Sequence, residues 1–341
     1  MQPLPCLGEG NYFRSAEVSL GVVCLAPYDL EVERAVREVV ALGAKKVMIQ
    51  APDGLKQYLG GLCESLEAAG VSPLLSTEPC YGGCDVADGA PVGADAIIHI
   101  GHFKFGGRPD PLPTVYITAR HLGGDRDLPA KAARAMKARG FRMVGIVSNA
   151  QHIHLIGEFR EALAAEGLEG VVDGETGGLV LGCRVGAATA VEGAVDALVF
   201  IGGGDFHALG VALACEKEVF IADPYRGEIR ETVQMKRRAL AKRWWLIAEA
   251  AKAKTFGVVI VTKPRQMDLA TAERLSSDLR RRGKVCFLLA GSDVSWDRLV
   301  GFAFIDAFIV VGCPRIATDN QECFSKPVLN AGEALEVIKR L

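Results

Sequence analysis

The sequence predicts an α/β protein built from three similar domains, each with a parallel four-stranded sheet flanked by helices. The main observation is a threefold repeat, in which an apolar run begins with Asp and ends with Gly: residues 95–101 (DAIIHIG), 196–202 (DALVFIG) and 306–312 (DAFIVVG). Such runs are typical of buried parallel strands. The chain has 341 residues, and at about 100 to 150 residues per domain this length suggests two or three domains. The repeat favours three.

Each repeat is predicted to alternate strands with helices that end at a capping glycine. The expected strand, helix and glycine are residues 46–50, 55–69 and Gly70 in the first copy, 143–147, 155–166 and Gly167 in the second, and 257–261, 268–282 and Gly283 in the third. A strand at 71–76 follows the first helix. Each copy then closes with a short strand, at 114–117, 218–222 and 327–329.

These elements place the domains at residues 1–118, which include an N-terminal arm, 119–226 and 227–341. The third domain includes a connecting helix predicted over 228–253, and a further helix is predicted over 28–42. The first 19 residues lack the pattern of a signal peptide, and no apolar run is long enough to span a membrane. We therefore expect a cytoplasmic protein without a membrane partner.

Composition narrows the function further. Half of the residues are hydrophobic and the formal net charge is -2, so the basic footprint of a nucleic-acid-binding protein is missing. Ten cysteines in a chain of this kind indicate metal or redox chemistry for some of them, rather than a disulfide framework. We expect most of the single cysteines to be small buried residues: Cys6, Cys24, Cys63, Cys215, Cys286 and Cys323.

Cys84, Cys183 and Cys313 lie in different repeats, and each directly follows a glycine. Cys84 and Cys183 precede the Asp-Ala strand by similar intervals, whereas Cys313 follows its strand, so convergence rests on strand ends rather than on symmetry. Three thiolates suit an iron-sulfur cluster with one open iron, because structural zinc normally takes four ligands. Cys80 is a reserve ligand, and the local motif of common radical enzymes is absent because Ala87 occupies its third position. On spacing alone, scattered structural cysteines are an equal alternative.

Several polar residues follow predicted strands. The loop 202–207 ends in His207 and precedes an apolar helix, so it can bind an anionic ligand or form an ordinary tight turn. Arg315 can pair with a carboxylate or make a surface salt bridge. Arg265 and Gln266 are comparable candidates. The pairs His99 with His102 and His152 with His154 are weak metal signals, for which hydrogen bonding or a core position is the favoured interpretation.

Taken in order along the chain, these motifs resemble the archaeal diphthamide biosynthesis enzymes, S-adenosylmethionine-dependent 3-amino-3-carboxypropyl transferases that act on a histidine of translation elongation factor 2. The resemblance covers nearly the whole chain and rests on residues 51–55 (APDGL), 81–85 (YGGCD), 148–154 (SNAQHIH), 180–183 (VLGC), 204–207 (GDFH), 223–225 (DPY) and 312–315 (GCPR). The chain departs from the family pattern at Gly83, where alanine is usual.

The resemblance implies three domains in a triangle around a central 4Fe-4S cluster, with Cys84, Cys183 and Cys313 as its ligands. The open iron would bind S-adenosylmethionine, and a radical mechanism would need no side chain as catalyst. On polarity and loop position we expect Gln266, Arg315 and His207 to contact S-adenosylmethionine. The family also implies a homodimer; the electron donor stays unknown.

Two other functions remain open. Quinolinate synthase, a 4Fe-4S dehydrating and condensing enzyme, also has three similar domains and three cysteine ligands, but its phosphate loop is not evident here. Alternatively, the chain is a noncatalytic electron-relay subunit of a diphthamide synthase complex. The presence of all three cysteines in one chain favours a self-sufficient enzyme.

Overall fold

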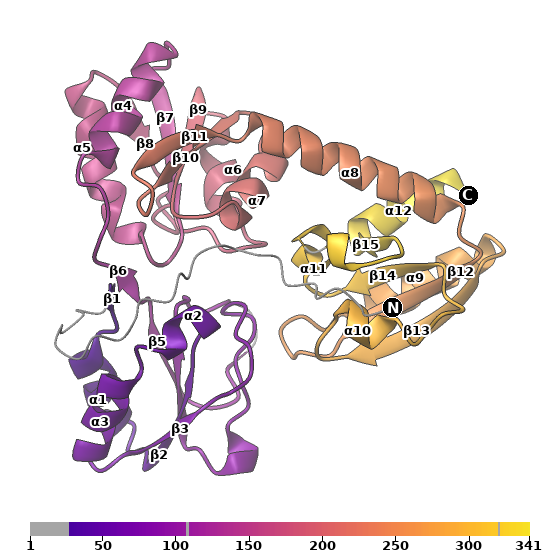
Figure 1. Cartoon of the computed structure of the whole chain (residues 1–341), viewed down its shortest axis with the longest axis horizontal. Helices are drawn as coiled ribbons and strands as arrows, with labels where there is room; N and C mark the ends of the chain where they lie inside the picture. The colour runs from indigo at the N-terminus through magenta and orange to yellow at the C-terminus, as the bar shows by residue number, and fades with distance from the viewer. Residues whose placement is uncertain (1–26, 107–108, 320) are drawn as a thin grey trace, which may run out of the picture.

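The computed structural model describes residues 27–106, 109–319 and 321–341. Three sheets share one strand order along their parallel parts: β3-β2-β4-β5, β8-β7-β9-β10 and β13-β12-β14-β15. In Figure 1 they form three separate bodies, coloured indigo, magenta to red, and orange to yellow, and the long helix α8 (Val233–Ala251) joins the second to the third. The predicted α/β class with three similar parallel sheets is confirmed.

The first sheet is covered on one face by two helices, which bury Val39, Leu62 and Leu66. Its elements are β2 (Lys46–Gln50), β3 (Ser72–Leu75), β4 (Ala96–Ile100), β5 (Thr114–Ile117), α1 (Val32–Ala41), α2 (Asp53–Lys56), α3 (Gly60–Ala68) and a 3-10 turn at Ala90–Val92. The helix predicted over 55–69 is wrong as a single element. It divides into α2 and α3 just before Gly60 and Gly61, because paired glycines lower helix propensity.

The helix predicted over 28–42 also starts too early. Residues Tyr28–Asp29 form the short strand β1, which pairs antiparallel with β6 (Arg120–His121). This two-stranded ribbon lies where the chain passes from the first body to the second (Figure 1). The helix α1 begins only after this ribbon. Tyr28, at the start of the predicted helix, therefore belongs to the connection between the first and second sheets.

The second sheet has helices on both faces. It contains β7 (Met143–Ser148), β8 (Glu169–Val171), β9 (Ala197–Ile201), β10 (Glu218–Asp223) and β11 (Glu228–Glu231), with α4 (Leu128–Ala138), α5 (Ile156–Ala165), α6 (Gly186–Glu192), α7 (Phe206–Ala214) and a 3-10 turn at Ile153–Leu155. The start of the predicted helix 228–253 is wrong, because β11 adds a fifth, antiparallel strand beside β10. Its central Ile229 packs on the core, and α8 then begins at Val233.

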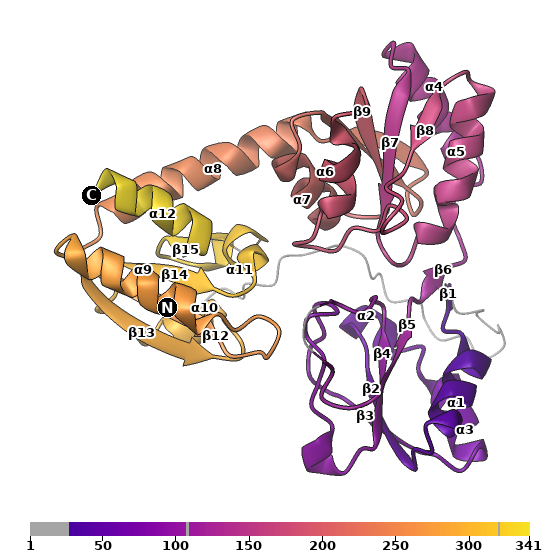
Figure 2. The same ribbon diagram turned by 180° about the vertical axis from the view of Figure 1, so that it is seen from behind.

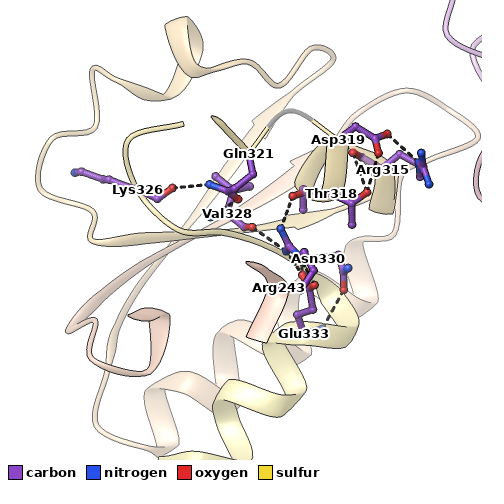
Figure 3. Close-up of polar contacts among 10 residues, drawn as sticks. Arg243, Arg315, Thr318, Asp319, Gln321, Lys326, Val328, Asn330 and Glu333 are labelled. Carbon is purple, nitrogen blue, oxygen red and sulfur yellow. Dashed lines mark hydrogen bonds and ion pairs between the residues drawn. The ribbon is translucent and has the colours of Figure 1, made fainter. Parts of the chain in front are cut away.

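The third sheet consists of β12 (Thr255–Val261), β13 (Val285–Gly291), β14 (Ala307–Val311) and β15 (Val328–Asn330), accompanied by α9 (Leu269–Arg281), α10 (Trp296–Leu299), α11 (Pro314–Asp319), α12 (Ala331–Arg340) and a 3-10 turn at Gln321–Cys323. The connecting helix α8 is fixed to this domain by Arg243, which forms an ion pair with Glu333 and donates to the carbonyls of Ala317, at 2.5 Å, and Val328, at 3.1 Å (Figure 3).

The aspartate that opens each repeated strand has the same task in all three sheets. The carboxylate of Asp95 accepts the backbone N–H groups of Lys45 and Lys46 at 2.8 and 2.9 Å, where the neighbouring strand begins. Asp196 does so for the start of β7 and Asp306 for the start of β12. These backbone hydrogen bonds lower the pKa of all three carboxyl groups. The repeat motif is therefore a clamp between adjacent strands.

The three predicted helix caps are confirmed, since Gly70, Gly167 and Gly283 have φ angles of 76°, 77° and 75°. Among the expected small buried cysteines, Cys215 and Cys286 are buried, Cys63 and Cys323 are half-buried, and Cys6 and Cys24 lie outside the described residues, as does the N-terminal segment 1–19. Within the described ranges, no helix combines the length and hydropathy needed to cross a bilayer.

Candidate metal-cluster site

The three cysteines of the repeats line one pocket of about 520 Å³. Cys84 comes from the loop after β3, Cys183 from the segment before α6, and Cys313 from the residue that follows β14 and precedes α11. Segments about a hundred residues apart in the sequence thus line one pocket, and the two opposite ribbon views show the three sheets arranged around a common centre (Figures 1 and 2).

Local backbone structure presents each sulfur to the pocket. Cys183 lies in a tight turn whose ends are joined by two hydrogen bonds between Leu181 and Arg184, at 2.9 and 3.0 Å. Cys313 follows Gly312, which has a φ of 153° and would place an added Cβ 2.5 Å from a methyl of Val261. Only glycine fits there, so the strand end and the cysteine after it are held in one position.

The third domain grips the loop of Cys84 from both sides. The ammonium of Lys263 pairs with Asp85 at 2.6 Å, and the Arg265 guanidinium donates to the carbonyl of Gly83 at 2.8 Å. Arg265 also pairs with Asp110, and both side chains are more than nine-tenths buried. These charge-assisted contacts bracket Cys84 and fix it relative to a domain some 180 residues away in the sequence.

Gln266 is the predicted S-adenosylmethionine contact that lines this pocket. Its amide Nε2 donates to the sulfur of Cys84 at 3.3 Å. A hydrogen bond to a sulfur is one of the levers by which proteins tune an iron-sulfur cluster. The structure thus places Gln266 against a predicted ligand as well as against the pocket.

Arg315 and His207 are placed differently. The guanidinium of Arg315 is occupied by Asp319 at 2.8 Å and by the carbonyl of Phe206 at 2.6 Å, and it lies 4.0 Å from the centroid of the Phe206 ring. Figure 3 shows its pairing with Asp319. His207 stacks on Phe200, with ring centroids 6.0 Å apart. Arg315 therefore serves the contact between the second and third domains, whereas His207 packs within the second, and in the described part of the chain neither lines the pocket.

The electrostatics of the pocket call for a cation. Burial raises the pKa of Cys84 to about 11, and it also raises the pKa of Cys183 and of Cys313. The sulfur of Cys313 further raises the pKa of the other two. Three converging thiols that resist ionisation next to one another form a donor set that suits a positively charged metal cluster.

Sequence reasoning did not identify the part played by Lys263, or that of Phe105, which lines the pocket and stacks under the Arg184 guanidinium at 5.0 Å. For Lys263 a signal was available, since it follows the apolar run of β12, where strand ends gather ligands. Phe105 offered none, because its partner comes from another domain.

Comparisons with known proteins give the family. A family model described as a diphthamide synthesis protein matches residues 51–340, which is most of the chain. The chain belongs to this family. Among curated members, the 2-(3-amino-3-carboxypropyl)histidine synthase of Pyrococcus horikoshii is 35% identical over 313 residues, covering 90% of this chain and 89% of that protein.

Other members of the diphthamide synthesis family are also similar. The 2-(3-amino-3-carboxypropyl)histidine synthase of Methanocaldococcus jannaschii is 28% identical, with coverage of 90% and 88%. A crystal structure of Dph2 from Pyrococcus horikoshii with a 4Fe-4S cluster superposes with a TM-score of 0.82 at 33% identity, covering 92% of this chain and 91% of that one. The resemblance noted in the sequence motifs is thus confirmed. The chain is an archaeal-type member of the diphthamide synthesis family.

Proposed function

We propose that this chain is a 2-(3-amino-3-carboxypropyl)histidine synthase, the enzyme of the first step of diphthamide biosynthesis. It transfers the 3-amino-3-carboxypropyl group of S-adenosylmethionine to an imidazole carbon of a histidine in a protein substrate. The convergence of Cys84, Cys183 and Cys313 on one pocket carries this proposal. It is supported by the synthase names of the similar proteins and by the 4Fe-4S cluster named for the similar crystal structure.

In this proposal Cys84, Cys183 and Cys313 hold a 4Fe-4S cluster. With three thiolate ligands such a cluster has one iron free for S-adenosylmethionine, and when bound it supplies the electron that breaks the bond from sulfur to the aminocarboxypropyl carbon. The residues of the chain would bind the cluster, orient its ligands and enclose the pocket. Gln266 donates to the Cys84 sulfur, while Lys263 and Arg265 hold the loop that carries this cysteine.

The contacts to S-adenosylmethionine are part of the proposal as well. Gln266 faces the pocket, and so do Asp268, which caps the N-terminus of α9, and Thr271 in the first turn of that helix. Arg315 directly follows Pro314, which lines the pocket. If its guanidinium exchanged Asp319 for the carboxylate of S-adenosylmethionine, its charge would contact that ligand. His207 would act indirectly, because its ring meets Phe206 edge-on with centroids 4.9 Å apart and Phe206 in turn packs against Arg315.

The proposed protein substrate is translation elongation factor 2. The enzymes of the family that the chain resembles act on a histidine of that factor, and diphthamide is the modified form of this histidine. A reducing compartment, the cytoplasm, suits this reaction: Cys84, Cys183 and Cys313 are free thiols, and oxidation to disulfides would remove them as metal ligands.

We also propose a homodimer, formed through the outer edge of the third sheet. Strand β13 is an edge strand of seven residues, and on it Val285, Phe287 and Leu288 are 52%, 42% and 43% exposed. Phe304, which is 57% exposed, contacts Phe287 with ring centroids 5.2 Å apart and extends this apolar surface. Antiparallel pairing of two copies of β13 about a twofold axis would satisfy both edges at once.

Anaerobic iron and sulfide analysis tests the central proposal. The wild-type chain should bind four irons per protomer, and Cys84→Ala, Cys183→Ala and Cys313→Ala should each lose most of this content. Cys215→Ala is the matched control, since this cysteine is buried in the core of the second domain. Full iron content in any of the three variants would contradict the ligand assignment.

Activity is tested with the reduced protein, S-adenosylmethionine and elongation factor 2. Mass spectrometry should detect one aminocarboxypropyl group on a histidine of the factor. Formation of quinolinate from its precursors instead would overturn the proposal, and a requirement for a second, different subunit would favour the electron-relay alternative.

For the dimer, Phe287→Asp should yield a monomer in light scattering, whereas Leu42→Asp, at an exposed position at the C-terminal end of α1, should not.

A further inference from the structure

A second group of metal-binding side chains lies in the first domain. The sulfur of Cys80, Nε2 of His99 and Nδ1 of His102 converge, and all three atoms lie within 4.8 Å of one another. The sulfur is 3.8 Å from the His99 nitrogen and 3.9 Å from the His102 nitrogen, and the two nitrogens are 3.1 Å apart. From sequence alone, His99 and His102 formed a paired weak metal signal and Cys80 was a reserve ligand of the cluster, but nothing there connected Cys80 with the two histidines.

The spacing of these atoms matches one face of a tetrahedral metal site. With zinc-sulfur and zinc-nitrogen bonds of about 2.3 and 2.0 Å, tetrahedral angles require about 3.6 Å between sulfur and nitrogen and about 3.3 Å between the nitrogens. The observed distances differ from these by only a few tenths of an ångström. A single ion fits between the three atoms after small side-chain rotations.

Gln50 sets the ring of His99 for such a role. Its Oε1 is 3.0 Å from Nδ1 of His99 and also accepts the backbone N–H of Ala87, while its Nε2 donates to the carbonyl of Asp85. Because Oε1 is an acceptor, His99 must carry its proton on Nδ1. The lone pair of Nε2 then faces Cys80 and His102, as the outer hydrogen bond of a metal-binding histidine requires.

The environment favours neutral imidazoles. Cys80 and Gln50 are 7% and 2% exposed, and His99 is fully buried. Burial lowers the pKa of His99 to about 3 and that of His102 to about 4, so both rings are neutral at ordinary pH, which is the form that binds metals. Burial raises the pKa of Cys80 to about 12, so a bound cation must displace the thiol proton.

We propose that Cys80, His99 and His102 form a second, mononuclear site for a zinc-like divalent cation, separate from the pocket of Cys84, Cys183 and Cys313. One thiolate and two imidazoles are typical zinc ligands, and a water molecule can complete the tetrahedron. The three donors share one ion, whereas the thiolates of a 4Fe-4S cluster each bind a different iron and stand around a larger pocket.

The site clamps the loop that carries Cys84. Cys80 belongs to this loop, whereas His99 lies in β4 and His102 follows that strand, so one ion ties the loop to the sheet. The same two segments are already in close contact, since a Cβ at Gly83 would lie 2.2 Å from the carbonyl oxygen of Phe103. The ion thus sets the position of Cys84 without touching it.

Cobalt(II) binding tests this inference in a variant without the proposed cluster, Cys84→Ala/Cys183→Ala/Cys313→Ala. This variant should bind one equivalent of Co²⁺, with the visible bands of a tetrahedral site and a near-ultraviolet band from sulfur-to-cobalt charge transfer. Adding Cys80→Ser should abolish the charge-transfer band. Adding His99→Gln or His102→Gln should weaken binding at least tenfold. Adding Cys215→Ser should change nothing.

Failure of the triple variant to bind Co²⁺, or binding that is unchanged by Cys80→Ser and His102→Gln, would overturn the site. Circular dichroism of each metal-free variant separates lost binding from misfolding. Metal analysis of the triple variant incubated with Zn²⁺ should find one zinc per chain. For the clamp, Zn²⁺ should slow amide hydrogen exchange in residues 77–89 by at least tenfold. Bound zinc without this protection would refute the clamp. If Cys84, Cys183 and Cys313 are not cluster ligands, the results expected for Co²⁺ binding and for hydrogen exchange stay the same.

Discussion

Gln266 shows how a single side chain couples the pocket to its proposed cofactor. Its amide hydrogen bond to the Cys84 sulfur disperses negative charge on that sulfur. Charge dispersal favours the reduced cluster, because reduction adds an electron. Gln266→Leu should therefore lower the midpoint reduction potential while leaving iron content near wild type.

Redox titration followed by electron paramagnetic resonance measures this shift. Gln57→Leu is the matched control, because the Gln57 amide donates to the nearby carbonyl of Gly54 on an exposed surface. An unchanged or higher potential in Gln266→Leu would show that this amide does not act on the cluster.

Gly83 is a second residue-scale constraint. Alanine at this position would place its Cβ 2.2 Å from the carbonyl oxygen of Phe103 and 3.3 Å from the backbone nitrogen of Phe105. Backbone atoms cannot yield as a side chain does, so the loop bearing Cys84 must move in this chain, even though alanine is usual at this position in the family pattern. We expect Gly83→Ala to reduce iron loading severalfold, whereas Gly61→Ala, where the added Cβ meets open space, should retain it. Equal loading of the two would mean that the loop adapts freely.

At this scale the sequence identified which residue types gather, but not the atoms they contact. Glycines beside Cys84, Cys183 and Cys313 and their positions near strand ends left convergence and scattered cysteines as equal alternatives. The family resemblance favoured convergence, and the pocket agrees with it. Pairing of Arg315 with a carboxylate was among the expectations, and Asp319 provides it. Its second partner could not be predicted, because the backbone carbonyl of Phe206 reaches Arg315 only when two domains pack together.

Among the elements, α8 is attached to the third domain by a buried ion pair in addition to the apolar packing of Leu246, Ile247 and Ala250. The side chains of Arg243 and Glu333 are 9% and 14% exposed, and Glu333 also completes the capping box of α12 with Asn330 (Figure 3). Arg243→Met removes the cation that pairs with the Glu333 carboxylate, which keeps only the backbone N–H of Asn330, and it removes the side-chain donor to the carbonyls of Ala317 and Val328. It should lower the free energy of unfolding by about 3 to 5 kcal/mol.

Urea denaturation followed by circular dichroism measures that loss. Arg237→Met lies on the exposed side of the same helix and should cost far less, since exposed charges contribute about 0 to 1 kcal/mol. Similar losses in both variants would mean that helix propensity, rather than the ion pair, determines the effect.

Element boundaries were the least predictable part of the fold. The apolar strands and their glycine caps follow from sequence alone because burial and φ angle each demand particular residue types. In contrast, β11 was assigned to the helix after it, since Glu228–Glu231 has no strong local preference. Pairing with β10 decides its conformation, and this pairing is a tertiary contact.

For the whole molecule, the histidines make stability dependent on pH. His152 is 1% exposed, and burial lowers its pKa to about 3 and that of His207 to about 4. The unfolded chain takes up these protons near pH 6.5, but the folded chain does not. Stability should therefore be full above pH 6.5 and should fall on acidification, by about 1.4 kcal/mol per pH unit for each such histidine.

Denaturation of the anaerobic protein at pH 7.5, 6.5 and 5.5 measures this dependence. The double variant His152→Gln/His207→Gln should be less stable at neutral pH but should lose less stability on acidification. A slope as steep as that of wild type would place the responsible groups elsewhere.

The three aspartate clamps bear on how the chain arose. Asp95, Asp196 and Asp306 make the same pair of backbone hydrogen bonds in sheets of the same strand order, as descent from one triplicated unit would leave them. Cys84 and Cys183 occupy matching places in that unit, but Cys313 does not. An ancestral unit could therefore have brought two of the cysteines together by duplication, whereas the third had to be acquired separately, after the copies had already diverged.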